Sequence, residues 1–153
     1  MGEPAPRRVV VRPVTAAERG EWEKLWKAYQ AFYQVALSDE TTAKAWARFH
    51  DAAEPMGVLG AFADGRLIGI AHYILHRSCW SVGDYCYLQD LYVAENARKL
   101  GAGGALIGAV EAVAREAGAS RIHWLTQEGN TTARKLYDTL AERSGFIQYR
   151  KLF

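Results

Sequence analysis

A glycine-rich turn is the feature of this sequence with the most readable chemistry. It reads Arg98-Lys99-Leu100-Gly101-Ala102-Gly103-Gly104 and joins a predicted strand, Tyr85–Val93, to a predicted Ala-rich helix, Ala105–Ala117. The first N–H groups of a helix have no partner within the helix, and glycines let an anion approach them closely. The pattern therefore predicts a phosphate-binding turn, and a glycine-rich turn that binds nothing is the alternative.

Two common phosphate motifs are excluded. The sequence contains no Gly-Lys-Ser/Thr, so the turn is not a P-loop. Gly101 and Gly103 fit the first positions of the dinucleotide-binding pattern Gly-x-Gly-x-x-Gly, but the third position is Leu106.

Other reactive side chains are scattered along the chain. Gln89 and Asp90 are adjacent in the predicted strand, and strand alternation sends them to opposite faces. His72 shares a strand face with His76, and we expect both to be packed, with a place in the acceptor site or a role as a base as the alternative. No third residue stands at metal-ligand spacing. The two cysteines, Cys79 and Cys86, lack a partner set that would activate a thiol. The sequence therefore predicts no metal site.

The elements that position these residues follow from periodicity and turn chemistry. Thr15 and Glu18 form a capping-box pattern ahead of a helix with a wide aromatic face, and Asp64-Gly65 is a favoured hairpin turn. The predicted strands are Val9–Val14, Val58–Ala63, Arg66–Arg77, Tyr85–Val93, Arg121–Gln127 and Phe146–Phe153. A second helix is predicted from about Thr41 to about Ala52, and a last helix from Thr131 to about Arg143. The order β-α-α-β-β-β-α-β-α-β predicts an α/β (α+β) fold with a mixed central sheet flanked by helices.

Composition bounds the class of protein. The chain has 153 residues, 50% hydrophobic and 24% charged, which suits one globular domain over residues 9–153 after a loose tail, residues 1–8. The 19 basic and 17 acidic residues leave a net charge of +2, which gives no reason to expect a nucleic-acid or membrane partner. No apolar run is long enough to span a bilayer and the N-terminus is unlike a signal peptide, so we expect a cytoplasmic protein.

Two separate motifs resemble the GNAT superfamily of N-acetyltransferases. Val93, Arg98, Gly101 and Gly103 match the superfamily's acetyl-CoA motif, Val-x-x-x-x-Arg-x-x-Gly-x-Gly/Ala. Asn130, Ala133, Leu136 and Tyr137 match its Asn-x-x-Ala-x-x-Leu-Tyr segment, and Gly145-Phe146 matches the pair that closes it. Within the superfamily the sequence is most similar to the small histone, polyamine and D-amino-acid acetyltransferases and to the diamine N-acetyltransferases.

The resemblance implies a GNAT fold, an acetyl-CoA (coenzyme A) co-substrate, and direct acetyl transfer to a primary amine. It implies that backbone N–H groups of the glycine-rich turn hold the pyrophosphate and that the pantetheine arm pairs with the strand ending at Val93. The implied cofactor-binding residues are Leu91, Val93, Arg98, Lys99, Leu100, Gly101, Ala102, Gly103, Gly104, Ala105, Asn130 and Arg134. Asn130 as a plain helix cap and Arg134 on a solvated helix face remain alternatives.

The resemblance also implies two catalytic residues, Tyr137 and Asp90. Tyr137 matches the superfamily's general acid, which protonates the departing thiolate. Where diamine-acting relatives have a Glu-Asp pair, this sequence has Gln89-Asp90, so Asp90 is the candidate general base. Three alternatives stay open: Asp90 acts through a water, another group is the base, or the amine arrives neutral.

The acceptor and the assembly are the least determined features. A polyamine, a diamine or an amino acid is the expected acceptor; a protein lysine such as one in a histone tail, or a non-catalytic CoA-binding role, is the alternative. The predicted last strand ends at Phe153, where many members of the superfamily have one further strand, and we expect the sheet edge left there to pair in a homodimer.

Overall fold

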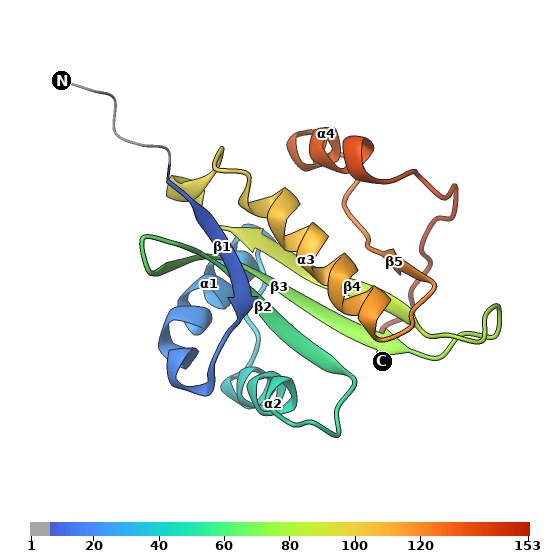
Figure 1. Cartoon of the computed structure of the whole chain (residues 1–153), viewed down its shortest axis with the longest axis horizontal. Helices are drawn as coiled ribbons and strands as arrows, with labels where there is room; N and C mark the ends of the chain where they lie inside the picture. The colour runs from blue at the N-terminus through green and yellow to red at the C-terminus, as the bar shows by residue number, and fades with distance from the viewer. Residues whose placement is uncertain (1–6) are drawn as a thin grey trace.

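The computed structural model describes residues 7–153, and a five-stranded sheet runs through it (Figure 1). Its strands are β1 (Val9–Pro13), β2 (Met56–Ala63), β3 (Arg66–His76), β4 (Tyr85–Val93) and β5 (Arg121–His123). They lie side by side in sequence order; the first four pair antiparallel and β5 pairs parallel to β4. The sheet is therefore mixed, as the sequence predicts.

Helices cover both faces of the sheet. α1 (Arg19–Phe32) and α2 (Asp39–Phe49) lie on one face, and α3 (Ala102–Glu116) lies on the other (Figure 1). Trp22, Trp26 and Trp46 of the first two helices pack with Ile70 in one buried cluster. Leu106 and its neighbours on α3 pack on the opposite face in a second, larger cluster. Short 3₁₀ turns, η1 (Ala16–Glu18) and η2 (Glu95–Ala97), precede α1 and α3.

α4 (Thr131–Leu140) lies beside the first turn of α3. A Cβ built on Gly103 would lie 3.3 Å from Cδ2 of Leu136, so the small residues at the start of α3 let α4 approach. The two segments that carry the sequence motifs are therefore neighbours in space.

A β-bulge interrupts the pairing of β4 with β3. His72 pairs with Asp90 and Tyr73 pairs with Leu88, so Gln89 is the extra residue. Before the bulge Leu88 packs into the α3-side cluster, and after it Leu91 does. Without the extra residue, alternation would turn Asp90 into that apolar cluster. The bulge instead directs Asp90 to the face covered by α1 and α2.

The predicted fold class and the element order are confirmed from β1 to α4, with one strand missing at the end. Residues 141–153 form no strand, and β5 ends at His123 rather than at Gln127. A strand needs a neighbour that completes its hydrogen bonds, and within residues 7–153 this segment has none. The prediction of a last strand at Phe146–Phe153 is therefore wrong for the isolated chain.

The ends of the chain bear on two further expectations. Most of the tail predicted at residues 1–8 lies outside the described residues, which begin at Arg7, two residues before β1. None of the helices between residues 7 and 153 combines the length and apolar character that crossing a membrane requires.

Candidate active site

The glycine-rich turn forms the N-terminus of α3. Gly101 is the N-cap residue and takes the left-handed conformation with φ +79°, which a residue with a Cβ adopts at a cost. The N–H of Ala105 donates to the Gly101 carbonyl at 3.1 Å, closing the first helical turn. The N–H groups just before it have no helical partner, and Arg98 and Lys99 stand exposed beside them. This arrangement suits a phosphate group.

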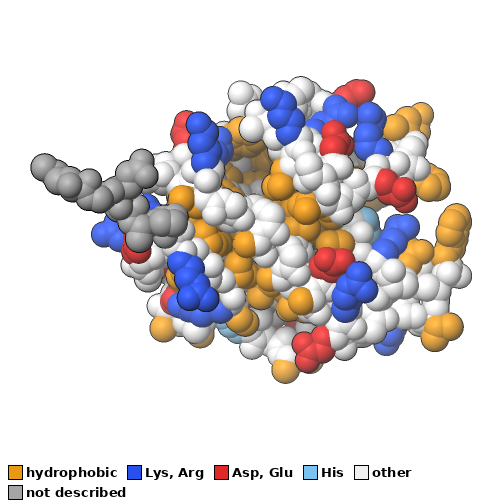
Figure 2. Space-filling model, turned by 45° about the horizontal axis from the view of Figure 1, so that its top comes forward, with side chains coloured by type: hydrophobic (Ala, Val, Ile, Leu, Met, Phe, Trp, Pro, Cys, Tyr) orange, Lys and Arg blue, Asp and Glu red, His pale blue; other side chains and the backbone are white. Residues whose placement is uncertain are grey.

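An open strand edge leads away from this turn. β4 pairs with β5 only from Tyr85 to Tyr87, so the stretch Leu88–Val93 has no strand on that side among the described residues. Free N–H and C=O groups along such an edge can pair with an extended ligand as if it were a strand. Figure 2 shows a hollow with hydrophobic side chains on the face that carries α3 and α4, with Lys and Arg side chains around it. Leu91 and Val93, both predicted cofactor residues, lie on this edge.

Asn130 and Arg134 approach the same region from α4. Asn130 is the N-cap of α4, but its side chain makes no capping bond; its Nδ2 instead donates to Thr126 Oγ1 at 3.4 Å. Arg134 donates from Nη1 to the Glu128 carbonyl at 2.6 Å. The plain-cap alternative for the Asn130 side chain is therefore wrong, while Arg134 fixes the loop before α4.

A pocket of about 470 Å³ opens on the opposite face of the sheet, between α1, α2 and the strands. Gln89 and Asp90 both line it, so the expectation that alternation separates them is wrong, because of the bulge between β3 and β4. Charged residues of α2 also line it, namely Glu40, Lys44 and Arg48. Neither Lys44 nor Arg48 forms an ion pair within residues 7–153. The pocket thus has carboxylates and free cations around one space.

Asp90 is held by a buried polar chain beneath this pocket. Its Oδ2 lies 2.9 Å from Nδ1 of His72, and Nε2 of His72 accepts a hydrogen bond from the Trp22 indole at 2.9 Å. The His72 side chain is 4% exposed and that of Asp90 is 15% exposed. The carboxylate therefore reaches the pocket while its far side is anchored in the core.

Three tyrosines near the site have raised pKa values. Burial, and then the charge of Asp90, raise the pKa of Tyr29 on α1 and that of Tyr33, the C-cap residue of α1. Burial, and then the nearby Tyr33, raise the pKa of Tyr137. The ring of Tyr137 also packs edge-on against Trp124, with centroids 5.4 Å apart. The rings of Tyr29 and Tyr33 pack edge-on against each other, with centroids 5.1 Å apart.

Several candidates lie elsewhere. His76 is exposed at the end of β3, with Nδ1 2.7 Å from the Arg77 carbonyl. Cys86 is buried, and burial raises the pKa of its thiol to about 11, while Cys79 is exposed. No group of three or more potential metal ligands occurs in the described part of the chain.

Sequence reasoning missed the residues around Asp90 on α1 and α2. Trp22, Tyr29 and Tyr33 lie on the aromatic face of one predicted helix. The same periodicity is expected of residues that only pack in the core, so it did not mark them as part of a site. Lys44 and Arg48 are four residues apart on α2, so they share one helix face, but nothing in the sequence shows what that face adjoins.

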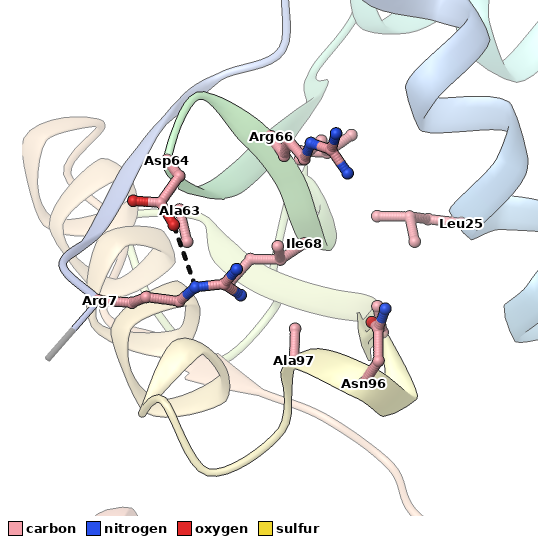
Figure 3. Close-up of a pocket in the computed structure, with 10 residues that line it drawn as sticks. Arg7, Leu25, Ala63, Asp64, Arg66, Ile68, Asn96 and Ala97 are labelled. Atoms are coloured by element: carbon pink, nitrogen blue, oxygen red, sulfur yellow. Dashed lines mark ion pairs between the residues drawn. The ribbon is translucent and has the colours of Figure 1, made fainter. Parts of the chain in front are cut away.

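A second hollow of about 360 Å³ lies near the start of the chain, between the β2–β3 turn, η2 and α1 (Figure 3). Arg7 crosses it to form an ion pair with Asp64, with 3.0 Å between Nε and Oδ2. None of the predicted site residues lines this hollow. It therefore lies apart from the candidate site.

Comparisons with known proteins bear on this arrangement. The chain is 35% identical over 146 residues to the D-amino-acid N-acetyltransferase HPA3 of Saccharomyces cerevisiae, covering 94% of this chain and 91% of that protein. It is 30% identical over 95 residues to a thialysine N-epsilon-acetyltransferase of Caenorhabditis elegans, covering 59% of each chain.

Solved structures share the fold. A ribosomal-protein-alanine N-acetyltransferase from Brucella melitensis biovar Abortus 2308 superposes with a TM-score of 0.81 at 20% identity, covering 95% of this chain and all of that one. The aminoglycoside N-acetyltransferase AAC(6')-Iy, solved with CoA, superposes with a TM-score of 0.80 at 21% identity, covering 97% and 98%. The model of the acetyltransferase (GNAT) family matches residues 22–141. The sequence resemblance is thereby confirmed, and the chain belongs to the GNAT acetyltransferase family.

Proposed function

We propose that this protein transfers an acetyl group from acetyl-CoA to the primary amine of a small molecule that also carries a carboxylate, such as an amino acid. The observation that carries the proposal is the pocket between α1, α2 and the sheet. Asp90 lines it from the sheet, and α2 contributes Glu40 together with Lys44 and Arg48, two cations that form no ion pair within residues 7–153. The names of two relatives, which act on D-amino acids and on thialysine, agree with it.

The acetyl-CoA site is proposed along the turn, the open edge of β4 and the start of α4. The backbone N–H groups of Ala102, Gly103 and Gly104 would hold the pyrophosphate, with Arg98 and Lys99 beside them. Leu91 and Val93 would pair with the pantetheine arm, and Asn130 would contact it, since its side chain is not used as a cap. Leu100, Gly101 and Ala105 shape the turn, and Arg134 holds the loop at its far side.

The chemistry requires a neutral amine and a protonated leaving group. The amine nitrogen bonds to the acetyl carbonyl carbon, and the carbon–sulfur bond of the thioester breaks. The ammonium loses two protons in all: one passes to Asp90 and on to solvent, and the other replaces the proton that Tyr137 gives to the thiolate. A backbone N–H near Leu91 would stabilise the charge on the acetyl oxygen.

The environment of Tyr137 suits this role. Burial raises its pKa above the ordinary value of 10, so the phenol is protonated at neutral pH. It can therefore donate a proton but does not compete with Asp90 as a base.

The pocket charges favour an amino acid over a polyamine. A polyamine is positive at every nitrogen, and Lys44 and Arg48 would repel its far end. An amino acid can place its ammonium at Asp90 and its carboxylate at the two cations, where an Arg–carboxylate pair has good geometry. On the α2 side the two cations outnumber the single carboxylate, Glu40, and this excess of positive charge sets the acceptor class in this proposal.

The test is a thiol-release assay with acetyl-CoA and a matched acceptor panel. The panel contains D- and L-lysine, thialysine, other D-amino acids, and cadaverine, which is lysine without its carboxylate, together with spermidine and a histone-tail peptide. We expect release with a carboxylate-bearing amine and little with cadaverine. Arg48→Ala should raise the KM of the amino acid and lower that of cadaverine, because the variant loses a charge that attracts the carboxylate and repels the second ammonium. Equal use of lysine and cadaverine would contradict the acceptor class, and no release with any amine would contradict the reaction.

We propose further that two copies associate through the C-terminal segment, residues 146–153. Its large apolar side chains are exposed on the single chain: Phe146, Ile147, Tyr149, Leu152 and Phe153. β5 is a sheet edge with one neighbour, on the side where this segment runs (Figure 1). Apolar exposure of this extent next to an open edge suits pairing with a second copy.

Light scattering at micromolar concentration tests this assembly. The full chain should have the mass of a dimer, and a chain that ends at Ser144 should have the mass of a monomer. A full chain that is monomeric would overturn the proposal, as would a dimer that persists after the truncation.

A further inference from the structure

We infer that His72 and Trp22 are positioning residues that hold Asp90 in one orientation for proton transfer, with His72 fixed in a single tautomer by the Trp22 indole. The inference rests on the proposed function and extends it to Trp22, which lies outside the pocket lining, and to His72, which is buried in the pocket wall beside Asp90. It starts from the chain of contacts Trp22–His72–Asp90, which joins α1, β3 and β4 across the core.

The tautomer follows from the donor and acceptor inventory of the three side chains. An indole N–H can only donate, so the contact of 2.9 Å from Trp22 Nε1 makes Nε2 of His72 an acceptor. A neutral imidazole has one N–H, which must then be on Nδ1. That nitrogen lies 2.9 Å from Asp90 Oδ2, and a carboxylate accepts from it. Both nitrogens of His72 are thus satisfied in the Nδ1–H form alone.

The same geometry keeps His72 out of the proton transfer itself. A proton on Nε2 would place two N–H groups against each other, with Trp22 0% exposed and unable to turn to solvent. The rings of Trp26 and Phe49 also pack on the imidazole, with centroids 5.0 and 4.6 Å away. His72 therefore acts through Asp90 and not on the amine.

The consequence for Asp90 is a carboxylate anchored through one oxygen. Oδ2 is bonded to His72, and the side chain lines the pocket together with Gln89 and with residues of α2. A buried hydrogen bond to a charged acceptor is among the stronger ones, and it removes rotational freedom from a side chain that must meet a substrate at a fixed distance. The bulge at Gln89 directs Asp90 to this face, and His72 fixes its rotation.

A purely structural role for His72, as a polar residue satisfied in the core, makes different predictions. It requires the two hydrogen bonds for stability only, so the loss of either should lower stability without changing turnover in the molecules that remain folded. The positioning role requires that the bond to Asp90 affect kcat, whatever happens to stability.

The experiment compares four variants of the full chain, using acetyl-CoA and the best acceptor from the panel above. His72→Leu removes both hydrogen bonds. His72→Asn restores an N–H donor near the position of Nδ1 but has no acceptor at the position of Nε2. Trp22→Phe removes the indole N–H that keeps Nε2 of His72 unprotonated. Trp46→Phe is the matched control, because Trp46 packs on Trp22 at 4.8 Å between centroids in the same cluster but does not bond to His72.

We expect His72→Leu to lower kcat by about 10- to 100-fold, because the variant should lose part of the rate enhancement that a positioned proton acceptor supplies. The KM for acetyl-CoA should be unchanged. His72→Asn should recover most of that loss, and Trp22→Phe should lower kcat more than Trp46→Phe. Heteronuclear NMR of the imidazole nitrogens should show His72 protonated at Nδ1 and bare at Nε2, and the Trp22→Phe protein should lose this single pattern.

Different outcomes overturn different statements. Equal kcat for the wild-type and His72→Leu proteins, in samples shown by circular dichroism to be folded, would overturn the positioning role, as would a His72→Asn protein no better than His72→Leu. A nitrogen spectrum with Nε2 protonated in the wild-type protein would overturn it without any activity measurement. A wild-type protein that acetylates no amine would instead contradict the proposed function, and the tautomer would still be measurable.

Discussion

Leu136 of α4 lies against Gly103 of α3, so that a Cβ on Gly103 would meet its Cδ2 at 3.3 Å. These residues belong to two sequence motifs that are more than thirty positions apart. Their contact places the start of α3, with its open N–H groups, beside the helix that carries Tyr137. The distance between the proposed phosphate site and the proposed acid therefore depends on a residue without a side chain.

Replacing Gly103 with valine should disturb both motifs together. The added branched side chain overlaps Leu136, and overpacking of this kind costs about 1–3 kcal/mol. We expect a destabilisation of that order, a higher KM for acetyl-CoA and a lower kcat, because α4 must shift. Urea unfolding and steady-state kinetics measure the two effects.

Gly108→Ala is the matched control on the same helix. A Cβ at Gly108 meets nothing within 4 Å, and Gly in a helix interior costs roughly 0.5–1 kcal/mol relative to Ala. This variant should be slightly more stable with unchanged kinetics. A Gly103→Val protein that behaves like Gly108→Ala would show that the approach of α4 is not restricted at this point.

Tyr137→Phe should lower kcat by about 10- to 1,000-fold, the order expected for the loss of a proton-transfer group. The ring still packs against Trp124, so the fold and the KM for acetyl-CoA should change little. Because burial raises the pKa of Tyr137, the wild-type phenol stays protonated up to at least its ordinary pKa of 10, and kcat should show no loss from this group between pH 7 and 10. Unchanged turnover in Tyr137→Phe would remove Tyr137 from the mechanism.

Glu18 should make stability depend on pH in the acid range. Its carboxylate bonds Arg12 through two contacts of 2.8 Å and accepts the Thr15 N–H at 2.9 Å, and these interactions lower its pKa from 4.5 to about 2. A lowered folded-state pKa gives stability that is complete above 4.5 and is lost as the pH falls through about 2. The carboxylate is close to solvent, so we expect Glu18→Gln to cost about 0.5–1 kcal/mol at pH 7.

Urea unfolding of the two proteins at several pH values measures this dependence. The difference between wild type and Glu18→Gln should shrink steadily below pH 4.5. Glu116→Gln, at the exposed end of α3, is the control, because the Glu116 carboxylate has no ion pair or hydrogen bond within residues 7–153. A gap between wild type and Glu18→Gln that is the same at pH 7 and pH 3 would show that the charge of Glu18 is not its cause.

The two cysteines should differ sharply toward a thiol reagent. Cys79 is exposed, whereas Cys86 is buried and its pKa is raised to about 11, so little thiolate is present at pH 8. We expect one rapidly reacting thiol in each native chain and two in each unfolded chain. The native Cys79→Ser protein should have no rapidly reacting thiol. Cys79→Ser should keep full activity and give a clean background for thiol release. Two fast thiols in the native protein would mean that the core around Cys86 opens.

Much of the framework could be predicted from the sequence. The glycine-rich turn, the capping pattern at Thr15 and the hairpin at Asp64-Gly65 are local features, fixed by φ preferences and by hydrogen bonds between residues a few positions apart. The two motifs identified the family for the same reason, because each is a short run of residues. The last strand could not be predicted correctly, since a strand exists only where another strand offers an edge.

The surroundings of Asp90 depend on the tertiary structure. Alternation along Tyr85–Val93 predicts that Gln89 and Asp90 point apart, and one unpaired residue in the ladder reverses that result for every residue after it. Trp22 and His72 are 50 positions apart in the chain, so no local pattern relates them. Lys44 and Arg48 line the pocket from α2, although charged residues at this helical spacing are equally common on a solvent-exposed face. The sequence by itself determined the family and the turn that would bind phosphate, because those depend on short-range backbone chemistry. Only the packing of α1 and α2 on the bulged sheet decided which side chains surround the Asp90 carboxylate. Those contacts depend on the pairing register of β3 and β4, which cannot be predicted from a local sequence pattern.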